Sequence, residues 1–300
     1  MLARFLIVCL AVSFVLLLWA GAALCAAFGW AAWWSVPLAL LGMLLVDAVS
    51  IGWSFALSGL YAGGAPGSAR LGLGGRLKLY LGEYVAYVRL FTFDQPLARR
   101  TLAGAAAPGT PVVLVPGIYC NAGLWRWMRR RLAALGVANT WAVTLEPPLA
   151  GIDALAARLA DHIEEICRRS GAQQVVVVGH SMGGLVARAC LRDPAARGRI
   201  ARIVTVGTPH RGSFLALWGP GRNALEMRRG SAWLAALNAG GDPPLPVVSL
   251  FSWHDNFVAP QDSSILPGAE NVPLAGVGHL ALAFSDAVAR RIAAEAAAAR

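Results

Sequence analysis

Residues 175–189, VVVVGHSMGGLVARA, restrict the fold of this chain more than any other segment. Four consecutive valines predict a buried strand, and the residues after Gly184 predict a helix. Gly179 and Gly183 suit a turn between them that is too tight for side chains. Ser181, which lies between these glycines, is then expected to adopt a strained conformation that lifts its hydroxyl above the sheet. Gly-X-Ser-X-Gly at a strand-to-helix junction therefore predicts a nucleophilic serine at position 181.

Strands and helices alternate along the rest of the chain from about residue 110. Apolar runs predict further strands at 111–117, 140–147, 202–208 and 246–252, and amphipathic patterns predict helices at 122–136, 152–169 and 279–300. Strands that alternate with helices of this length indicate an α/β fold with a mostly parallel central sheet. Residues 209–244 interrupt this alternation of strands and helices. They predict a cap insertion over the carboxyl edge of the strands, where ligands bind in open α/β sheets.

A nucleophilic serine needs a general base, and five histidines are available. His162 lies in a predicted helix and His180 lies within the turn itself, so three candidates remain. Of these, His279 follows glycines in AGVGHLAL, in a loop after the predicted strands and before the last helix. A loop at that position can bring an imidazole over the sheet edge. We expect His279 to be the base, in preference to His210 and His254.

The base needs an acid that orients it, and four aspartates come into question. Asp255, in LFSWHDNFVAP, follows the carboxyl end of a predicted strand and is the expected acid. Asp262 follows a few residues later and is the reserve candidate. Asp242 precedes the same strand and so belongs to the opposite edge of the sheet, and Asp286 belongs to the final helix.

An acyl-transfer site also needs two N–H donors for the oxyanion. The backbone N–H of Met182, directly after the serine, is one expected donor. The other is expected from the loop VVLVPGIYCNAG, where Gly117 allows close backbone approach and Ile118 supplies the N–H, in preference to Tyr119.

From about residue 111 the chain resembles the α/β-hydrolase superfamily, and within it the bacterial lipases and esterases. The motifs that carry the resemblance are PGIYCN, GHSMGG, GTPHRGS, SWHDNFVAP and VGH, together with the cap-like segment MRRGSAWLAALN. The resemblance implies a triad of Ser181, Asp255 and His279, with Ile118 and Met182 as oxyanion donors. It also assigns His210, in TPH, a structural position. Many lipases have His-Gly where this chain has Pro-Gly at 116–117.

The first 60 residues differ in composition from the rest. No charged residue lies between Arg4 and Asp47, and residues 5–28 and about 33–57 are apolar. The first stretch is long enough to cross a hydrocarbon core about 30 Å thick. Trp30, Trp33 and Trp34 lie where the two stretches meet, as is typical of an aromatic belt at a tight hairpin. We therefore predict two transmembrane helices joined by a tight hairpin.

A cleaved signal peptide is the alternative for the first stretch. That stretch is longer than the apolar region of a usual signal peptide, and a second apolar stretch follows it closely, so we favour retained helices. Arg4 precedes the first helix, whereas Arg70, Arg76 and Lys78 follow the second. The positive-inside rule then predicts a bacterial inner-membrane protein whose catalytic domain faces the cytoplasm.

The expected organisation is a membrane segment at 1–60, a linker and lead-in at 61–109, and a catalytic domain at 110–300 with the cap at about 209–244. Glycines are frequent at 58–82, which favours a linker there, and a short helix is expected near 83–93.

The net charge of +10 does not predict a nucleic-acid partner, because the arginines are dispersed and no nucleic-acid motif is present. A basic surface beside anionic lipid headgroups explains the charge. The five cysteines have no metal-ligand spacing, and no dinucleotide or phosphate loop is found, so we expect neither metal nor cofactor.

The sequence thus predicts a membrane-anchored serine hydrolase that cleaves carboxylic esters, with lipid acyl esters as the leading substrate class. Acyl transfer or amide cleavage by the same triad is an alternative, as is a non-catalytic membrane scaffold with a hydrolase-like domain. The expected partners are membrane lipids and an ester substrate, and the sequence leaves the oligomeric state open.

Overall fold

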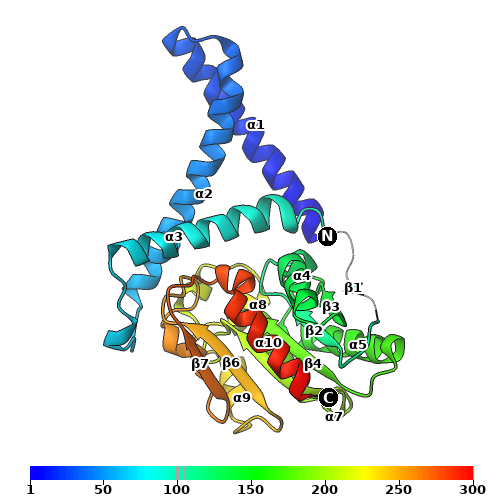
Figure 1. Ribbon diagram of the computed structural model, residues 1–300. Coiled ribbons are helices and arrows are strands. Elements are labelled where there is room, and N and C mark those ends of the chain that lie inside the picture. Colours follow the sequence, from blue (N-terminus) through cyan, green and yellow to red (C-terminus); the bar gives the residue numbers. More distant parts are fainter. Residues whose placement is uncertain (99–101, 105, 300) are drawn as a thin grey trace.

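The computed structural model describes residues 1–98, 102–104 and 106–299. Two long apolar helices, α1 (Leu2–Phe28) and α2 (Ser35–Leu60), form a hairpin closed by the short 3₁₀ helix η1 (Ala32–Trp34). A third helix, α3 (Leu73–Val88), crosses the base of this hairpin and continues into the π-helix η3 (Arg89–Asp94). The remaining elements form an α/β domain on the other side of α3 (Figure 1).

The α/β domain is built on a sheet with the order β1-β3-β2-β4-β5-β6-β7. All neighbouring strands are parallel except β1, which pairs antiparallel with β3. The strand bearing the Gly-X-Ser-X-Gly turn, β4, therefore lies in the middle of the sheet. The strands are β1 (Leu102–Gly104), β2 (Val112–Val115), β3 (Thr140–Val143), β4 (Val175–His180), β5 (Ile200–Val206), β6 (Val247–Ser252) and β7 (Glu270–Leu274).

Helices cover both faces of this sheet. Val175 and Val177 of β4 belong to one buried apolar cluster with α5 and α6, whereas Val176 and Val178 belong to a second cluster with α4 and α10. Successive side chains of a strand point to opposite faces, so a run of four valines is what a strand buried on both sides requires. The helices of the domain are α4 (Arg126–Ala134), α5 (Ile152–Ser170), α6 (Met182–Cys190), α7 (Pro194–Gly198), α8 (Arg222–Glu226), α9 (Ala232–Asn238) and α10 (Asp286–Ala298).

The structure differs from the sequence-based expectation at β7 and in the region before the domain. The strand β7 is a partly exposed edge strand that contains Pro273, so it lacks the buried apolar run that predicts the other strands. The expected linker at 58–82 is wrong up to Leu60, where α2 ends, and from Leu73 onward, because α3 begins there and not near Glu83. Burial of Leu79 and Ala86 of α3 supplies packing that outweighs the low helix propensity of its glycines.

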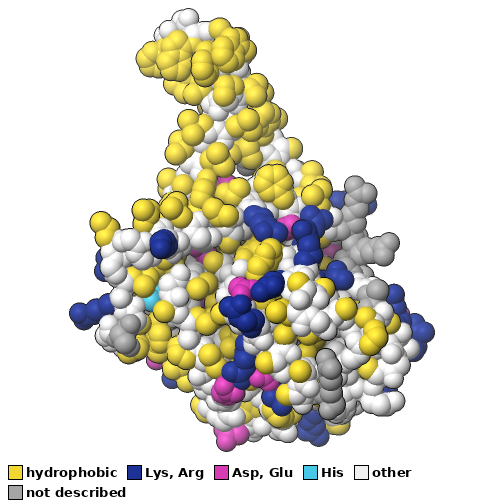
Figure 2. Space-filling model, in the orientation of Figure 1, with side chains coloured by type: hydrophobic (Ala, Val, Ile, Leu, Met, Phe, Trp, Pro, Cys, Tyr) yellow, Lys and Arg dark blue, Asp and Glu magenta, His cyan; other side chains and the backbone are white. Residues whose placement is uncertain are grey.

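Hydrophobic side chains cover much of the hairpin on the face shown in Figure 2. The segments Leu2–Phe28 and Ala32–Leu60 each contain an 18-residue window with a mean hydropathy of 2.6 and 1.9, respectively, and are long enough to cross a membrane. Large side chains such as Trp19 and Val49 are 75% and 71% exposed, which distinguishes these helices from the buried core helices of a soluble domain. By length and composition, α1 and α2 fit possible transmembrane spans.

The packing of α5 generates a stability prediction. Leu159 of α5 is fully buried in the first cluster, so Leu159→Ala should lower the free energy of unfolding by about 2–5 kcal/mol. The matched control is Leu149→Ala, in a loop where the leucine is 46% exposed, and its cost should be below about 1 kcal/mol. Denaturant unfolding of the two full-length variants in detergent checks this, and equal midpoints would contradict the assigned core.

Candidate active site

Ser181 lies at the junction of β4 and α6 in a strained backbone conformation, with φ 54° and ψ −125°. Its flanking glycines are sterically required. A Cβ at Gly179 would lie 2.4 Å from the backbone nitrogen of Gly184, and a Cβ at Gly183 would lie 2.5 Å from the carbonyl oxygen of Val115. The turn therefore has the geometry that the sequence predicts for GHSMG, with the serine at its apex.

Neighbouring elements hold this turn from two sides. The Ser181 N–H donates to the carbonyl oxygen of Val206 in β5, at 2.8 Å. The Thr208 hydroxyl donates to the carbonyl oxygen of Ser181 at 2.9 Å. Thr208 also fills the space beside Gly184, where a Cβ would lie 2.1 Å from its hydroxyl oxygen. A glycine at 184 thus permits the contact that holds the serine backbone.

His279 and Asp255 form a buried pair beside this turn. The distance from His279 Nδ1 to Asp255 Oδ2 is 2.7 Å, and the residues are only 4% and 2% exposed. The other oxygen of Asp255 accepts the N–H groups of Phe257 and Val258, at 2.8 and 2.7 Å. These bonds fix the carboxylate in the loop after β6. Asp255 thereby fixes the orientation of the imidazole through Nδ1, with Nε2 as the other ring nitrogen.

Two opposing effects act on the pKa of His279. Burial alone would lower it, but the Asp255 carboxylate, its hydrogen bond and the charge of Glu83 together outweigh burial, and the pKa is raised above its usual value. His180, within the turn, donates from Nε2–H to the carbonyl oxygen of His279, at 3.0 Å. Burial lowers the pKa of His180 to about 3, so this ring is neutral at pH 7.

The other histidine and carboxylate candidates lie elsewhere. His210 is buried between Arg188 and Thr205, with ring-nitrogen contacts of 3.3 and 3.1 Å, which is the structural position that the resemblance implies. Asp262, the reserve acid, pairs with Arg211 at 3.1 Å.

Asp286 pairs with Arg131, and Asp242 is exposed. Asp255 is thus the candidate acid that the structure brings to His279.

The expected oxyanion loop approaches the serine closely. A Cβ at Gly117 would lie 3.0 Å from the Cβ of Ser181, which places the 116–118 backbone beside the hydroxyl. Ile118 lines the same cavity as Ser181, and Met182 is the first residue of α6. Tyr119 follows with a positive φ of 57°, and its hydroxyl donates to the carbonyl oxygen of Pro220 at 2.6 Å.

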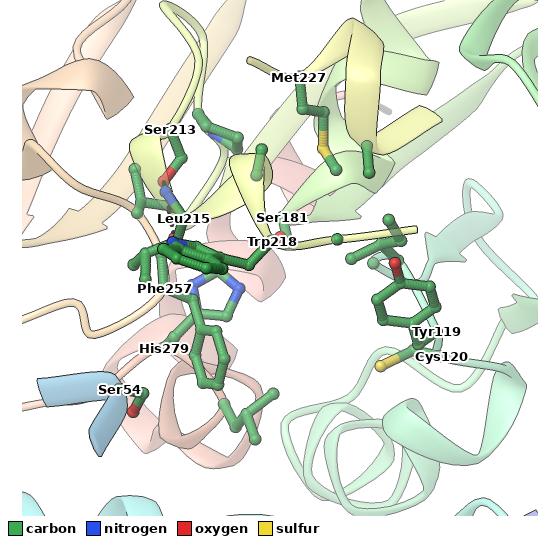
Figure 3. A pocket seen from close by; sticks show the side chains of 18 of the residues that line it. Ser54, Tyr119, Cys120, Ser181, Ser213, Leu215, Trp218, Met227, Phe257 and His279 are labelled. Atoms are coloured by element: carbon green, nitrogen blue, oxygen red, sulfur yellow. Dashed lines mark hydrogen bonds between the residues drawn. The ribbon is translucent and has the colours of Figure 1, made fainter. Parts of the chain in front are cut away.

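A cavity of about 630 Å³ opens onto these groups, and its walls are mostly apolar. Ser181 and His279 lie together on its inner wall (Figure 3). The first half of the cap contributes Leu215, Trp218 and Met227, whereas α9, in the second half, packs into the core with α5 and α6. A pocket of this size holds a ligand of several tens of atoms.

Cys120, although it lines the cavity, is a poor nucleophile. Burial raises the pKa of its thiol to about 12, so it stays protonated at neutral pH. The described residues contain no group of three or more His, Cys, Asp or Glu side chains that could hold a metal ion.

Residues of the apolar hairpin also reach the site, and sequence reasoning missed them. The Ser58 hydroxyl of α2 donates to the carbonyl oxygen of Asp255 at 2.9 Å. Asn256 donates to the Ser54 hydroxyl at 2.8 Å and accepts the N–H of His279 at 3.0 Å. The available signal was the serine spacing of four in an apolar helix, which places both hydroxyls on one face.

Glu83 of α3 is a further contact that the sequence did not reveal. This carboxylate is fully buried and accepts the N–H groups of Leu280 and Ala281, both at 2.9 Å, directly after His279. Burial raises the pKa of Glu83 to about 7, although the two backbone hydrogen bonds act in the opposite direction.

Comparisons with known proteins agree with this architecture. Residues 156–255 match the family model of the PGAP1-like alpha/beta domain. Among solved structures, Aspergillus fumigatus lipase B superposes with a TM-score of 0.54 at 20% identity, over 63% of this chain and 55% of the lipase. The mature form of Bacillus licheniformis lipase BlEst2 gives 0.53 at 19% identity, over 59% of this chain and 88% of that chain.

The chain has the α/β-hydrolase fold. The parallel sheet, the helices on both faces and the tight turn after β4 confirm the expected fold class. At identities near 20%, the likeness to the two lipases establishes the fold and not the reaction. The chain also spans only about half the length of the Aspergillus lipase, so the activity of that whole protein does not transfer with the fold.

The His279–Asp255 pair generates a prediction on pKa. Asp255→Asn removes the negative charge that raises the pKa of His279 while burial persists, so this pKa should fall below its wild-type value. NMR titration of ¹⁵N-labelled histidine, with His279→Gln for assignment, measures the shift. Asp242→Asn, at an exposed aspartate, is the matched control and should leave the titration unchanged. A wild-type pKa in Asp255→Asn would show that the pair is not coupled.

Proposed function

We propose that this protein is a serine hydrolase that cleaves carboxylic esters. The observation that carries the proposal is that a strained serine, Ser181, and His279, which is paired with the buried Asp255, both line one apolar cavity. Three groups of these types, in the chain order Ser, Asp, His, supply the nucleophile, the base and the orienting acid of an acyl-transfer reaction.

In the proposed mechanism, His279 Nε2 takes the proton of the Ser181 hydroxyl as its oxygen attacks the acyl carbonyl carbon. Asp255 stabilises the imidazolium through Nδ1–H. The N–H groups of Met182 and Ile118 stabilise the negative oxygen of the tetrahedral intermediate. The imidazolium then protonates the leaving alcohol, and a water molecule, activated by the same histidine, hydrolyses the acyl-enzyme.

The proposed substrates are esters with a long acyl chain, such as lipids. The support comes from the cavity, whose apolar wall includes Leu215, Met227 and Phe257. Burial of each methylene of an acyl chain against such a wall contributes about 0.8 kcal/mol. The two similar solved structures also carry the name lipase.

We further propose that α1 and α2 anchor the enzyme in the bacterial inner membrane, as a segment at 1–60 that precedes the catalytic domain at 110–300. The N-terminal amino group contacts Glu146 of the hydrolase domain at 2.6 Å, so α1 begins beside the domain that follows α2. Both open ends of the hairpin then lie on one side of the membrane. The distribution of Arg4, Arg70 and Arg76 favours the cytoplasmic side.

Fluorophosphonate labelling tests the proposed nucleophile. Membranes that contain the wild-type protein should show one labelled band near 31.5 kDa, and Ser181→Ala should abolish it, a loss of at least about 10³-fold in labelling rate. Ser170→Ala, at the end of α5 and away from the cavity, is the matched control and should label like the wild type. A folded, membrane-inserted wild type that does not react would favour the scaffold alternative.

A further inference from the structure

The second helix of the hairpin forms part of the cavity wall. Ile51, Ser54 and Leu57 of α2 line the same cavity as Ser181 and His279, and Ser54 is visible at its edge in Figure 3. This wall is docked on the hydrolase domain through the Ser54–Asn256 and Ser58–Asp255 hydrogen bonds. An anchor that served only to tether the domain would not need these contacts.

The helix α3, near this cavity, has the apolar stripe expected of a helix that lies at a membrane surface. Leu73, Leu77, Leu81 and Val85 recur every four residues along α3 and are 86%, 58%, 48% and 60% exposed. They form an apolar stripe on a helix that crosses the base of the hairpin (Figure 1). Such a helix is stable in the plane of the headgroups with its apolar face in the acyl region.

The cavity thus lies where a membrane helix, an interfacial helix and the hydrolase domain meet. The segment that begins with α3 continues to Tyr87 and Phe91, and both line the cavity. If α2 spans the membrane, a lipid chain that follows α2 from the bilayer would meet this apolar wall, and such a path is favoured because exposure of apolar surface to water is costly.

We propose that α2 is a substrate-binding element, and that the acyl chain of a membrane lipid lies against Ile51 and Leu57 while its ester reaches Ser181. This inference rests on the proposed esterase activity and assigns its acyl subsite to the hairpin. The hairpin is then both the anchor and one wall of the active site.

Leu57→Trp tests this subsite, since it fills the α2 side of the cavity and leaves the groups around Ser181 untouched. For the purified full-length protein in detergent, kcat/KM for p-nitrophenyl palmitate should fall at least about tenfold, with that for p-nitrophenyl butyrate nearly unchanged. Leu45→Trp, on an exposed face of the same helix, is the matched control and should leave both values unchanged. An unaltered palmitate-to-butyrate ratio in Leu57→Trp would overturn the inference.

Whether the acyl chain of the substrate comes from the bilayer is tested in proteoliposomes that contain a long-chain ester. Dilution of that ester with more phosphatidylcholine, at constant bulk concentration, should lower the rate, because the bilayer supplies the substrate. A rate that follows only the bulk concentration would overturn access from the bilayer. Absence of butyrate hydrolysis and of fluorophosphonate labelling in the wild type would instead refute the proposed function itself.

A second inference rests on a different observation, the buried carboxylate of Glu83. Its two hydrogen bonds fix the backbone directly after His279, and a Cβ at Gly278 would lie 2.4 Å from Glu83 Oε2. The glycine before the histidine thus makes room for the carboxylate. We infer that Glu83 is a positioning residue that holds the His279 loop at the correct distance from Ser181.

Glu83→Ala should lower kcat for p-nitrophenyl butyrate by about ten- to a hundredfold at a nearly unchanged KM, because misplacement of a base affects the chemical step. Glu83→Gln retains one acceptor and should restore part of the loss. Glu164→Ala, at an exposed carboxylate of α5, is the matched control and should retain the wild-type kcat. A wild-type kcat in folded Glu83→Ala, or a loss that only follows its thermal stability, would overturn this role.

Discussion

The backbone strain at Ser181 is the constraint around which the centre of the hydrolase domain is arranged. A positive φ at a serine costs on the order of 1–3 kcal/mol, so the surrounding structure must hold it. The central strand β4, the bond to Val206 and the Thr208 hydroxyl do so. The turn also needs a backbone without side chains at Gly179, Gly183 and Gly184, where a Cβ would clash with Gly184, Val115 and Thr208, respectively. The short motif is thus the local part of an arrangement that extends over three strands.

The hairpin and the hydrolase domain share buried polar contacts. Polar groups taken out of water are costly unless they are hydrogen-bonded, and Ser54, Ser58 and Glu83 each find partners in the loops of Asp255 and His279. Undocking of α2 or α3 would leave several buried donors without acceptors. The contacts of α2 and α3 therefore help to fix the geometry of the two loops.

The pKa values of His279 and Glu83 depend on the burial of both groups in the same part of the site. Asp255, His279 and Glu83 lie within one desolvated region, where a positive charge on the imidazole is favoured by the carboxylates and opposed by burial. Burial and Asp255 raise the pKa of Glu83, while the Leu280 and Ala281 N–H groups and His279 lower it.

The sequence alone determined the fold class, because valine runs that are apolar on both faces and a glycine-flanked serine fit few arrangements. It also picked out Ser181, Asp255 and His279 from loop positions that follow strands. It did not predict β7, because this partly exposed edge strand lacks a buried apolar run, or the start of α3, because the glycines there are typical of a linker. Only the tertiary structure brought Ser54, Ser58 and Glu83 to the site, since their contacts span about 200 positions of sequence separation. Local patterns record which face of an element is buried, but they hold no information on which distant element covers it.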